Sequence, residues 1–537
     1  MKLQWRYFRK TAKSFRSRFL LSSFLSALCA ILNVLVPVFL RGLVQGIGDG
    51  LPVGRLLLQG FLILICIVLS ILLSIALYMS LDSFGGLFIK DICGKIRTSL
   101  LSTDMSNVDS LGSNRICHVL YNDVLEAFRV VGHHFPMLFG CVFIIVGTLV
   151  LSFGGSPVIS LFLAVSVSLG IVISMVSRKA IYKASTATNA KLKNIHGLAD
   201  QFAKTIAWVR TNEVGDLFGK RFDESIDDFV DVSRQEDKRI YLLSGLTNNF
   251  NLVMEILLSI LVSIPIAGRN VPNYVFYVFV FSLTMKQGER IEGLLQQILR
   301  SEVSFRNIDE IYGLDIPQRD VEVDTVSSIE FEDVSFCYGS LSVLNEFNLR
   351  LDRGDSLLLE GGNGRGKSTL LKLVRGLYEV KDGSLKLNGV DVGRISEESL
   401  HRNVLYVGQD EIVLNGTPIE YLREVVSPVL GASFNDEMAR SVLEEVGFDG
   451  FCSRSIQENG GSLSGGQLKK LLLAKFLALY STASVILIDE LHSGLDAETK
   501  AKLNRLLGRI VERKDKIVVV VSHEDVPGIA FSKRLEL

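Results

Sequence analysis

Residues 361 to 369 combine the residue types and the spacing of a phosphate-binding loop. Their order, Gly-Gly-Asn-Gly-Arg-Gly-Lys-Ser-Thr, fits the pattern G-x-x-x-x-G-K-[ST]. An apolar run precedes the loop and a helical pattern follows it, which argues against a chance match in a glycine-rich segment. We expect Lys367 to contact the terminal phosphates and the Ser368 hydroxyl to hold Mg²⁺. Phosphate contacts are expected from Gly361, Gly362, Asn363, Gly364, Arg365, Gly366, Lys367, Ser368 and Thr369.

Two adjacent carboxylates end a second apolar run, residues 484 to 490. A buried central strand would deliver Asp489 and Glu490 to its carboxyl-terminal edge. We expect Asp489 to bind Mg²⁺ through water and Glu490 to polarise the attacking water. Acidic residues after an apolar strand can also cap a helix, and this run alone leaves that alternative open.

A third segment lies between these two, and it resembles the signature sequence of the ABC ATPases. It reads Leu-Ser-Gly-Gly-Gln and contributes Ser464, Gly465, Gly466 and Gln467. A helix that begins here offers a second anion-binding N-terminus. In the family, two ATPase domains pack head to tail, and the signature of one closes over ATP held by the other. The resemblance therefore implies ATP and Mg²⁺ as cofactors and pairing with a second ATPase domain.

Further family motifs follow in order within residues 330 to 525. By resemblance, Tyr338 stacks on adenine, Gln409 links Mg²⁺ and water to the membrane domain, and His523 is the switch histidine beside the γ-phosphate. Asp496 matches the loop that crosses the dimer interface, and Glu458 matches the loop that touches the membrane domain. Lysines follow the signature where the family commonly has Arg-Gln-Arg, and Gly494 replaces the usual alanine. Neither departure affects the catalytic positions Glu490, His523 and Gln409.

Composition divides the chain into two blocks, and the second of them contains the motifs described above. Residues 1–320 alternate long apolar runs with basic stretches, whereas residues 321–537 alternate short β-rich and helical runs. We expect an all-α six-helix transmembrane domain, then an α/β ATPase domain, with a linker at 309–327. The formal net charge is −1, and no basic patch is interleaved with aromatic residues, so we exclude a nucleic-acid partner.

Six apolar stretches predict membrane spans, at residues 19–40, 56–81, 135–153, 158–176, 242–266 and 271–285. Lys and Arg concentrate in the N-terminus and in segments 90–129 and 177–240, which places these on the cytoplasmic side. We therefore expect an integral protein of a bacterial inner membrane with the ATPase domain in the cytoplasm. The basic N-terminus predicts an amphipathic interfacial helix, with a cleaved transit peptide as the alternative.

Segments 82–134 and 177–241 predict helices that extend the spans into the cytoplasm, with reversals near 106–114 and 210–215. Residues 154–157, Gly-Gly-Ser-Pro, predict a tight turn between spans three and four. The two cytoplasmic tips are candidate contacts with an ATPase domain, unless they are only solvated hairpin ends. This layout resembles the exporter type of ABC transporter.

We expect ATP-driven export of an amphipathic peptide, lipid or drug by a homodimer, although a heterodimer with another chain fits the motifs equally. An importer or lipid flippase of the same architecture, and an ATP-gated channel or regulator, are the alternatives. Polar residues of the fifth span, Asn248, Asn249, Asn251 and Glu255, are candidate cargo contacts or interhelical bonds.

Overall fold

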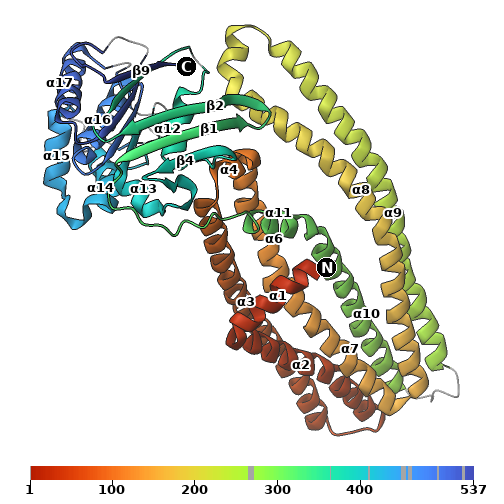
Figure 1. The fold of residues 1–537 in the computed structure, drawn as a ribbon. Helices are drawn as coiled ribbons and strands as arrows, with labels where there is room; N and C mark the ends of the chain where they lie inside the picture. The colour runs from red at the N-terminus through yellow and green to blue at the C-terminus, as the bar shows by residue number, and fades with distance from the viewer. Residues whose placement is uncertain are drawn as a thin grey trace. The chain divides into compact units, whose positions relative to one another are not determined.

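A computed structural model describes residues 2–263, 271–362, 364–408, 412–448, 455–456, 463–492, 495–522 and 526–537. The chain divides into two compact units. Unit 1 contains residues 1–97 and 116–312, and unit 2 contains residues 98–115 and 313–537. The expected fold class is confirmed, since a helical region precedes an α/β region along the chain (Figure 1).

Unit 1 is built from helices (Figure 1). They are α1 (Lys2–Ser14), α2 (Arg16–Gly48), α3 (Val53–Ser102), α5 (Ser113–His118), α6 (Val124–Phe128), α7 (Phe135–Gly155), α8 (Pro157–Thr211), α9 (Gly215–Ser263), α10 (Val271–Arg300) and α11 (Glu302–Tyr312), with π-helical turns at Val119–Asp123 and Arg129–His134. Helix α8 is 55 residues long, which corresponds to about 80 Å at 1.5 Å per residue. It runs beside α9, and the reversals expected near 154–157 and 210–215 are confirmed.

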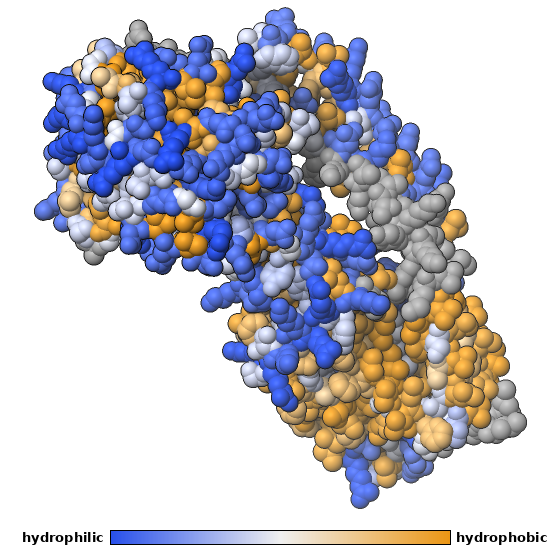
Figure 2. Space-filling model, in the orientation of Figure 1, coloured by the Kyte–Doolittle hydropathy of each residue, from blue (hydrophilic) through white to orange (hydrophobic). Residues whose placement is uncertain are grey.

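Three helical segments of the described chain are long and apolar enough to cross a membrane. They are Arg16–Gly48, Val53–Ser102 and Ser113–Gly155, and shorter apolar stretches lie at Pro157–Ile173 and Leu252–Val262. Much of this surface is exposed in the single chain, as with Leu57, Phe61 and Leu72 of α3. Hydrophobic side chains gather over the lower helices of unit 1 in Figure 2. This surface requires lipid or protein cover.

The expected linker begins later than residue 309. Helix α11 continues to Tyr312 because Phe305, Ile308 and Ile311 form one buried apolar face. Helix α1 packs beside it: the Arg6 guanidinium lies 2.6 Å from the Asp309 carboxylate, and the Tyr7 hydroxyl donates to the same carboxylate at 3.0 Å. The N-terminal segment is therefore a helix with one packed face, and its interfacial role remains a prediction.

Unit 2 contains two sheets in its described residues. The antiparallel sheet has the order β2-β1-β4-β5, and the parallel sheet has the order β6-β7-β8-β3-β9. Their strands are β1 (Ser328–Tyr338), β2 (Leu341–Asp352), β3 (Ser356–Glu360), β4 (Asp382–Leu387), β5 (Val390–Asp391), β6 (Val404–Val407), β7 (Val485–Asp489), β8 (Ile517–Val521) and β9 (Lys533–Glu536). The helices are α4 (Met105–Leu111), α12 (Lys367–Val374), α13 (Glu397–Asn403), α14 (Pro418–Leu430), α15 (Asp436–Glu445), α16 (Gly465–Leu479) and α17 (Ala497–Arg513).

Both faces of the parallel sheet are buried. Along β8, Val518 and Val520 belong to a core shared with α14 to α17, whereas Val519 and Val521 belong to a core shared with α12, α13 and the antiparallel sheet. Side chains alternate between the faces of a strand, so an uninterrupted apolar run serves both cores. This explains why β7 and β8 consist of apolar residues until the final Asp489.

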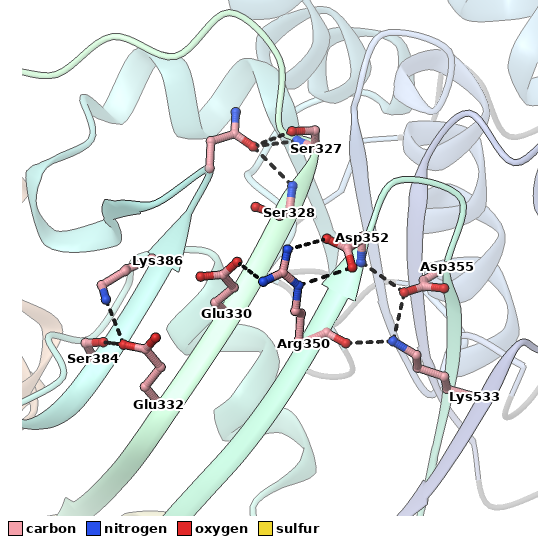
Figure 3. Close-up of polar contacts among 11 residues, drawn as sticks. Ser327, Ser328, Glu330, Glu332, Arg350, Asp352, Asp355, Ser384, Lys386 and Lys533 are labelled. Carbon is pink, nitrogen blue, oxygen red and sulfur yellow. Dashed lines mark hydrogen bonds and ion pairs between the residues drawn. The ribbon is translucent and has the colours of Figure 1, made fainter.

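Charged residues link the two sheets at their surface (Figure 3). The Lys533 ammonium of β9 lies 2.8 Å from the Asp355 carboxylate and donates to the Arg350 carbonyl of β2 at 2.7 Å. Arg350 itself pairs with Glu330 at 2.9 Å. These exposed pairs contribute little stability individually, but they orient β9 beside the edge of the antiparallel sheet.

Candidate functional site

The phosphate loop and the two adjacent carboxylates come together at the carboxyl-terminal edge of the parallel sheet. Leu359 of β3 and Asp489 of β7 both pair with Val521 of the intervening strand β8, so the three strands end at one level. The phosphate loop follows β3, the two carboxylates end β7, and Ser522 follows β8. This edge is where parallel sheets in α/β proteins bind ligands.

The end of the phosphate loop, at Gly366, packs closely against strand β2. Gly366, the residue before α12, has φ +92°, and an added Cβ would lie 2.8 Å from the Val343 side chain. The Lys367 ammonium donates to the carbonyls of Gly361 and Gly362, both at 2.8 Å. The side chain is buried and held over the loop, where an arriving phosphate oxygen can compete for its protons.

Asp489 and Ser368 form the part of the site suited to a cation. Asp489 is buried, and its Oδ1 has no hydrogen-bond partner in the described structure. Burial raises the pKa of Asp489, while a hydrogen bond with Ser368 opposes that shift. A buried carboxylate oxygen beside a hydroxyl is the oxygen donor set that Mg²⁺ prefers, so these residues fit the ion. When bound, Mg²⁺ would neutralise charge on the phosphate oxygens.

Glu490 directly follows strand β7 and has a left-handed backbone conformation. Its φ is +53°, which is uncommon for a residue other than glycine, and its backbone N–H donates to the Val521 carbonyl at 3.1 Å. Such backbone strain is typical of residues whose orientation matters for function. The adjacent carboxylates therefore occupy different environments: Asp489 is buried and Glu490 is half-buried.

The signature segment begins helix α16 with a reciprocal cap. The Gln467 N–H donates to the Ser464 hydroxyl at 3.2 Å, and the Ser464 N–H donates to the Gln467 side chain at 2.8 Å. Among the described residues, an added Cβ at Gly465 would meet no atom beyond its own helix within 4 Å. As far as the structure describes it, the N-terminus of α16 is therefore open on its outer side, where backbone N–H groups can donate hydrogen bonds to an anion.

Asp496 caps helix α17 and pairs with the signature helix. Its carboxylate accepts from the Thr499 N–H at 2.8 Å and lies 3.2 Å from the Lys470 ammonium. These hydrogen bonds, together with Lys470, lower the pKa of Asp496 to about 2. The carboxylate is thus ionised at neutral pH and connects α16 with α17.

Tyr338 belongs to an aromatic cluster that reaches helix α4. Its ring meets Tyr378 edge to face at 5.3 Å, and its hydroxyl lies 3.4 Å from Thr369 of the helix after the loop. The Tyr378 hydroxyl donates to Asp109 of α4 at 2.7 Å. Asp104, the N-cap of α4, accepts from the Glu379 N–H at 2.6 Å.

The sequence identified Tyr338 and the tip near 106–114 separately but did not identify Tyr378. The Tyr378–Asp109 hydrogen bond joins residues 269 positions apart, and no spacing pattern along the chain indicates it. Asn363, Gln409, Glu458, Ser493, Gly494 and His523 lie outside the described residues. Their roles remain predictions.

We expect Asp489→Asn to stabilise the nucleotide-free protein and to weaken its response to Mg²⁺. Removing a buried charge with one unbonded oxygen should raise the melting temperature by roughly 2–4 °C, as about 1 kcal/mol does in a domain of this size. In the wild type, the charged Asp489 carboxylate costs folding free energy at pH 7, because its pKa is raised in the folded state. Below the ordinary Asp pKa of about 4 the carboxyl is protonated in both states and this cost is absent. The stability gain of Asp489→Asn should therefore be present at pH 7 and vanish near about pH 4.

Thermal melts with and without Mg-ATP measure both effects. The exposed Asp515→Asn serves as the control for the charge change. Unaltered stabilisation by Mg-ATP in Asp489→Asn would contradict the assignment of Asp489 to the cation.

Sequence comparisons match both parts of the chain to known families. Residues 344–493 match the family described as "ABC transporter", and residues 19–286 match the "ABC transporter transmembrane region". The two matches place the membrane-spanning and nucleotide-binding families in the same order as the two expected domains.

Several curated proteins are similar to this chain. A probable ABC transporter ATP-binding/permease protein of Haemophilus influenzae is 30% identical over 249 residues, which cover 45% of this chain and 41% of the relative. An ATP-dependent lipid A-core flippase of Desulfotalea psychrophila is 30% identical over 36% of this chain and 34% of the relative. A β-(1→2)-glucan export protein of Rhizobium johnstonii is 28% identical over 40% and 38%. The chain therefore aligns with less than half the length of these relatives.

Proposed function

Because the chain belongs to the ABC transporter family and joins a transmembrane region to an ATPase domain, we propose that it is half of an ATP-driven pump. The proposal rests chiefly on the meeting of Lys367, Ser368 and Asp489 at one sheet edge, on a chain that also carries apolar helices. ATP would bind at this edge, and its hydrolysis would drive an amphipathic molecule across a membrane.

A second ATPase domain would complete each ATP site. The open N-terminus of α16 supports this pairing, since an added Cβ at Gly465 would meet no described atom beyond its own helix within 4 Å. We propose a homodimer, with a heterodimer as the alternative, because a related chain with its own loop and signature would serve equally. Ser464, Gly465, Gly466 and Gln467 would then close over a nucleotide held by the partner's phosphate loop.

Glu490 would orient and polarise the water that attacks the γ-phosphate. Lys367 would hold the β- and γ-phosphate oxygens, and Ser368 and Asp489 would hold Mg²⁺. By resemblance, Gln409 and His523 complete this set, and Tyr338 stacks on adenine.

The protein is integral to a membrane, and we propose six spans with the N-terminus and ATPase domain in the cytoplasm of a bacterium. Helices α2, α3 and α7 support three of the spans, while α8, α9 and α10 would supply the others with shorter apolar stretches. The basic segments at 90–129 and 177–240 support the orientation.

An amphipathic peptide, lipid or drug is the proposed cargo. The relatives include a lipid A-core flippase and a glucan export protein, so the family name by itself does not choose a cargo. In the fifth span, Asn249 donates to the Gly245 carbonyl of its own helix at 2.7 Å, and Glu255 is half-buried. Side chains of Asn248 and Asn251 lie outside the described part. Glu255 therefore remains the candidate contact for a cationic group.

Reconstitution in lipid vesicles tests the proposal. We expect Mg²⁺-dependent ATP hydrolysis that is stimulated by one class of compound among peptides, lipids and hydrophobic cations. The stimulating compound should also accumulate on one side of the membrane. Export and import are distinguished by the side on which cargo accumulates. Turnover that no compound stimulates, with no movement of cargo, would instead support a channel or regulator.

The Asp109 contact provides a matched test of coupling in the same vesicles. Asp109→Asn weakens the acceptor for the Tyr378 hydroxyl while leaving the phosphate loop intact. We expect basal hydrolysis to stay near the wild-type rate and cargo-stimulated hydrolysis to fall severalfold. Ser110→Ala in the same short helix, whose hydroxyl bonds only to the nearby Asn107 carbonyl in the described structure, should behave as wild type.

A further inference from the structure

A cleft in unit 2 extends from the end of the phosphate site toward solvent. It has a volume of about 390 Å³, and its lining includes Ser368 and Asp489 at one end. Helices α12, α13 and α16 and strand β6 supply the remaining walls. About 30 Å³ is the share of one water in the liquid, so the cleft can hold a small oxyanion with its hydration.

The ionisable side chains of this lining are mostly basic. Lys372, Arg375, His401 and Lys475 face the cleft, and Asp489 is the acidic residue among the described lining residues. Lys372 and Arg375 come from α12 and its C-terminal end, one or two turns beyond Ser368. Lys475 comes from the signature helix α16, about a hundred residues away in sequence, so only the tertiary fold brings the four together.

Arg375 is held in place without being saturated by protein acceptors. Its side chain is 16% exposed, and its Nη2 donates to His401 Nδ1 at 3.3 Å. Its Nη1 has no hydrogen-bond partner in the described structure and lies 4.0 Å from the Glu397 carboxylate. A guanidinium only donates, so His401 carries its own proton on Nε2 and offers a second donor.

The positive groups also disfavour one another. Burial lowers the pKa of His401, and Arg375 and Lys475 lower it further. Burial likewise lowers the pKa of Arg375. Glu397, the nearest carboxylate to Arg375, already pairs with Arg319. Lys475 donates to the Tyr406 carbonyl at 3.4 Å, a long contact. Four basic side chains against one carboxylate in the described lining favour an anionic ligand with several oxygens.

We propose that this cleft binds inorganic phosphate and that phosphate leaves the ATP site through it after hydrolysis. Ser368 and Asp489 form the inner end of the cleft and lie where the terminal phosphates would be held. Beyond them, the departing phosphate would accept hydrogen bonds in turn from Lys372, Arg375, His401 and Lys475. The binding site stands on this geometry alone, whereas its role in release rests on the proposed ATPase function.

Orthophosphate binding tests the site without any hydrolysis. Full-length protein in lipid nanodiscs, with Lys367→Ala to weaken binding at the loop, is titrated with orthophosphate at constant ionic strength in a calorimeter. We expect Lys475→Gln to weaken binding about tenfold, the loss of one charge-assisted contact. Lys502→Gln removes the same charge on α17, where Lys502 pairs with Glu498 at 3.0 Å, and should change nothing. Equal affinity in Lys475→Gln and its control would overturn the site.

Measuring phosphate release tests whether the cleft is the exit route during turnover. This experiment uses protein that retains Lys367. Single-turnover hydrolysis is measured by chemical quench, and release is measured by a fluorescent phosphate-binding protein in parallel. We expect Lys475→Gln to lengthen the delay between them severalfold with unchanged ATP affinity. An unchanged delay would overturn the release route.

A protein that hydrolyses no ATP would contradict the proposed function, and the calorimetric result would still decide whether the cleft binds phosphate. Arg375→Gln gives a second variant, and a melting curve establishes that each variant is folded.

Discussion

Glu490→Gln should bind Mg-ATP with nearly wild-type affinity, lose hydrolysis and accumulate a closed dimer. Glutamine keeps the size of the side chain but cannot accept a proton from water, and loss of a general base typically costs at least about a hundredfold in rate. Because the nucleotide would persist, the two ATPase domains should stay together instead of separating after turnover. Nucleotide trapping and size-exclusion chromatography measure binding and assembly, and phosphate production measures turnover.

The control for this variant is Glu512→Gln, an exposed glutamate on helix α17. It makes the same chemical change away from the sheet edge and should hydrolyse ATP normally. Loss of ATP binding in Glu490→Gln would contradict the assigned role, since that outcome would make Glu490 a structural or binding residue. If Glu490→Gln hydrolysed ATP at a rate within a few-fold of wild type, another group would have to be the general base.

Lys367→Ala should have the opposite signature, with weak ATP binding and no trapped dimer. The ammonium lies over the loop in contact with the Gly361 and Gly362 carbonyls, so it is already placed where phosphate oxygens would replace those acceptors. Loss of this charged donor should weaken ATP binding by roughly tenfold to a hundredfold. Fluorescent nucleotide titration measures the affinity.

Two observations separate binding from folding in this variant. Lys381→Ala, at an exposed position outside the loop, controls for loss of a lysine. Thermal melting without nucleotide reports whether removal of the two carbonyl contacts loosens the loop. Unchanged ATP affinity in Lys367→Ala would show that the phosphates bind elsewhere.

The strand and helix that flank Lys367 could be predicted from the sequence because they are local, while the nucleotide bound there remains a prediction. Residues 356 to 369 contain strand, loop and helix in one continuous segment, so the pattern around Lys367 specified its own surroundings. The same holds for the reversal at Ser156, where a proline begins the next helix, and for the end of α8 at Thr211. In each case the physical signal lies within about ten residues of the feature.

Predictions that depend on average hydropathy were less exact. Helices α2, α3 and α7 meet the requirements for a membrane span, whereas α8 and α9 carry shorter apolar stretches within long helices that also contain charged residues. The linker prediction failed at 309–312 because the buried side of α11 depends on neighbours that packing alone supplies.

The sequence by itself predicted the chemistry: a phosphate loop, two acidic residues at a strand end, a second anion-binding helix terminus and an apolar block before them. The tertiary structure decided the environment of each of these groups, because burial and long-range contacts are not encoded in a short sequence pattern. It leaves Asp489 Oδ1 without a partner, binds Tyr378 to Asp109, and brings Lys475 to the cleft beside Arg375. Each of these depends on segments far apart in the chain, whose approach is set by the packing of both faces of the parallel sheet.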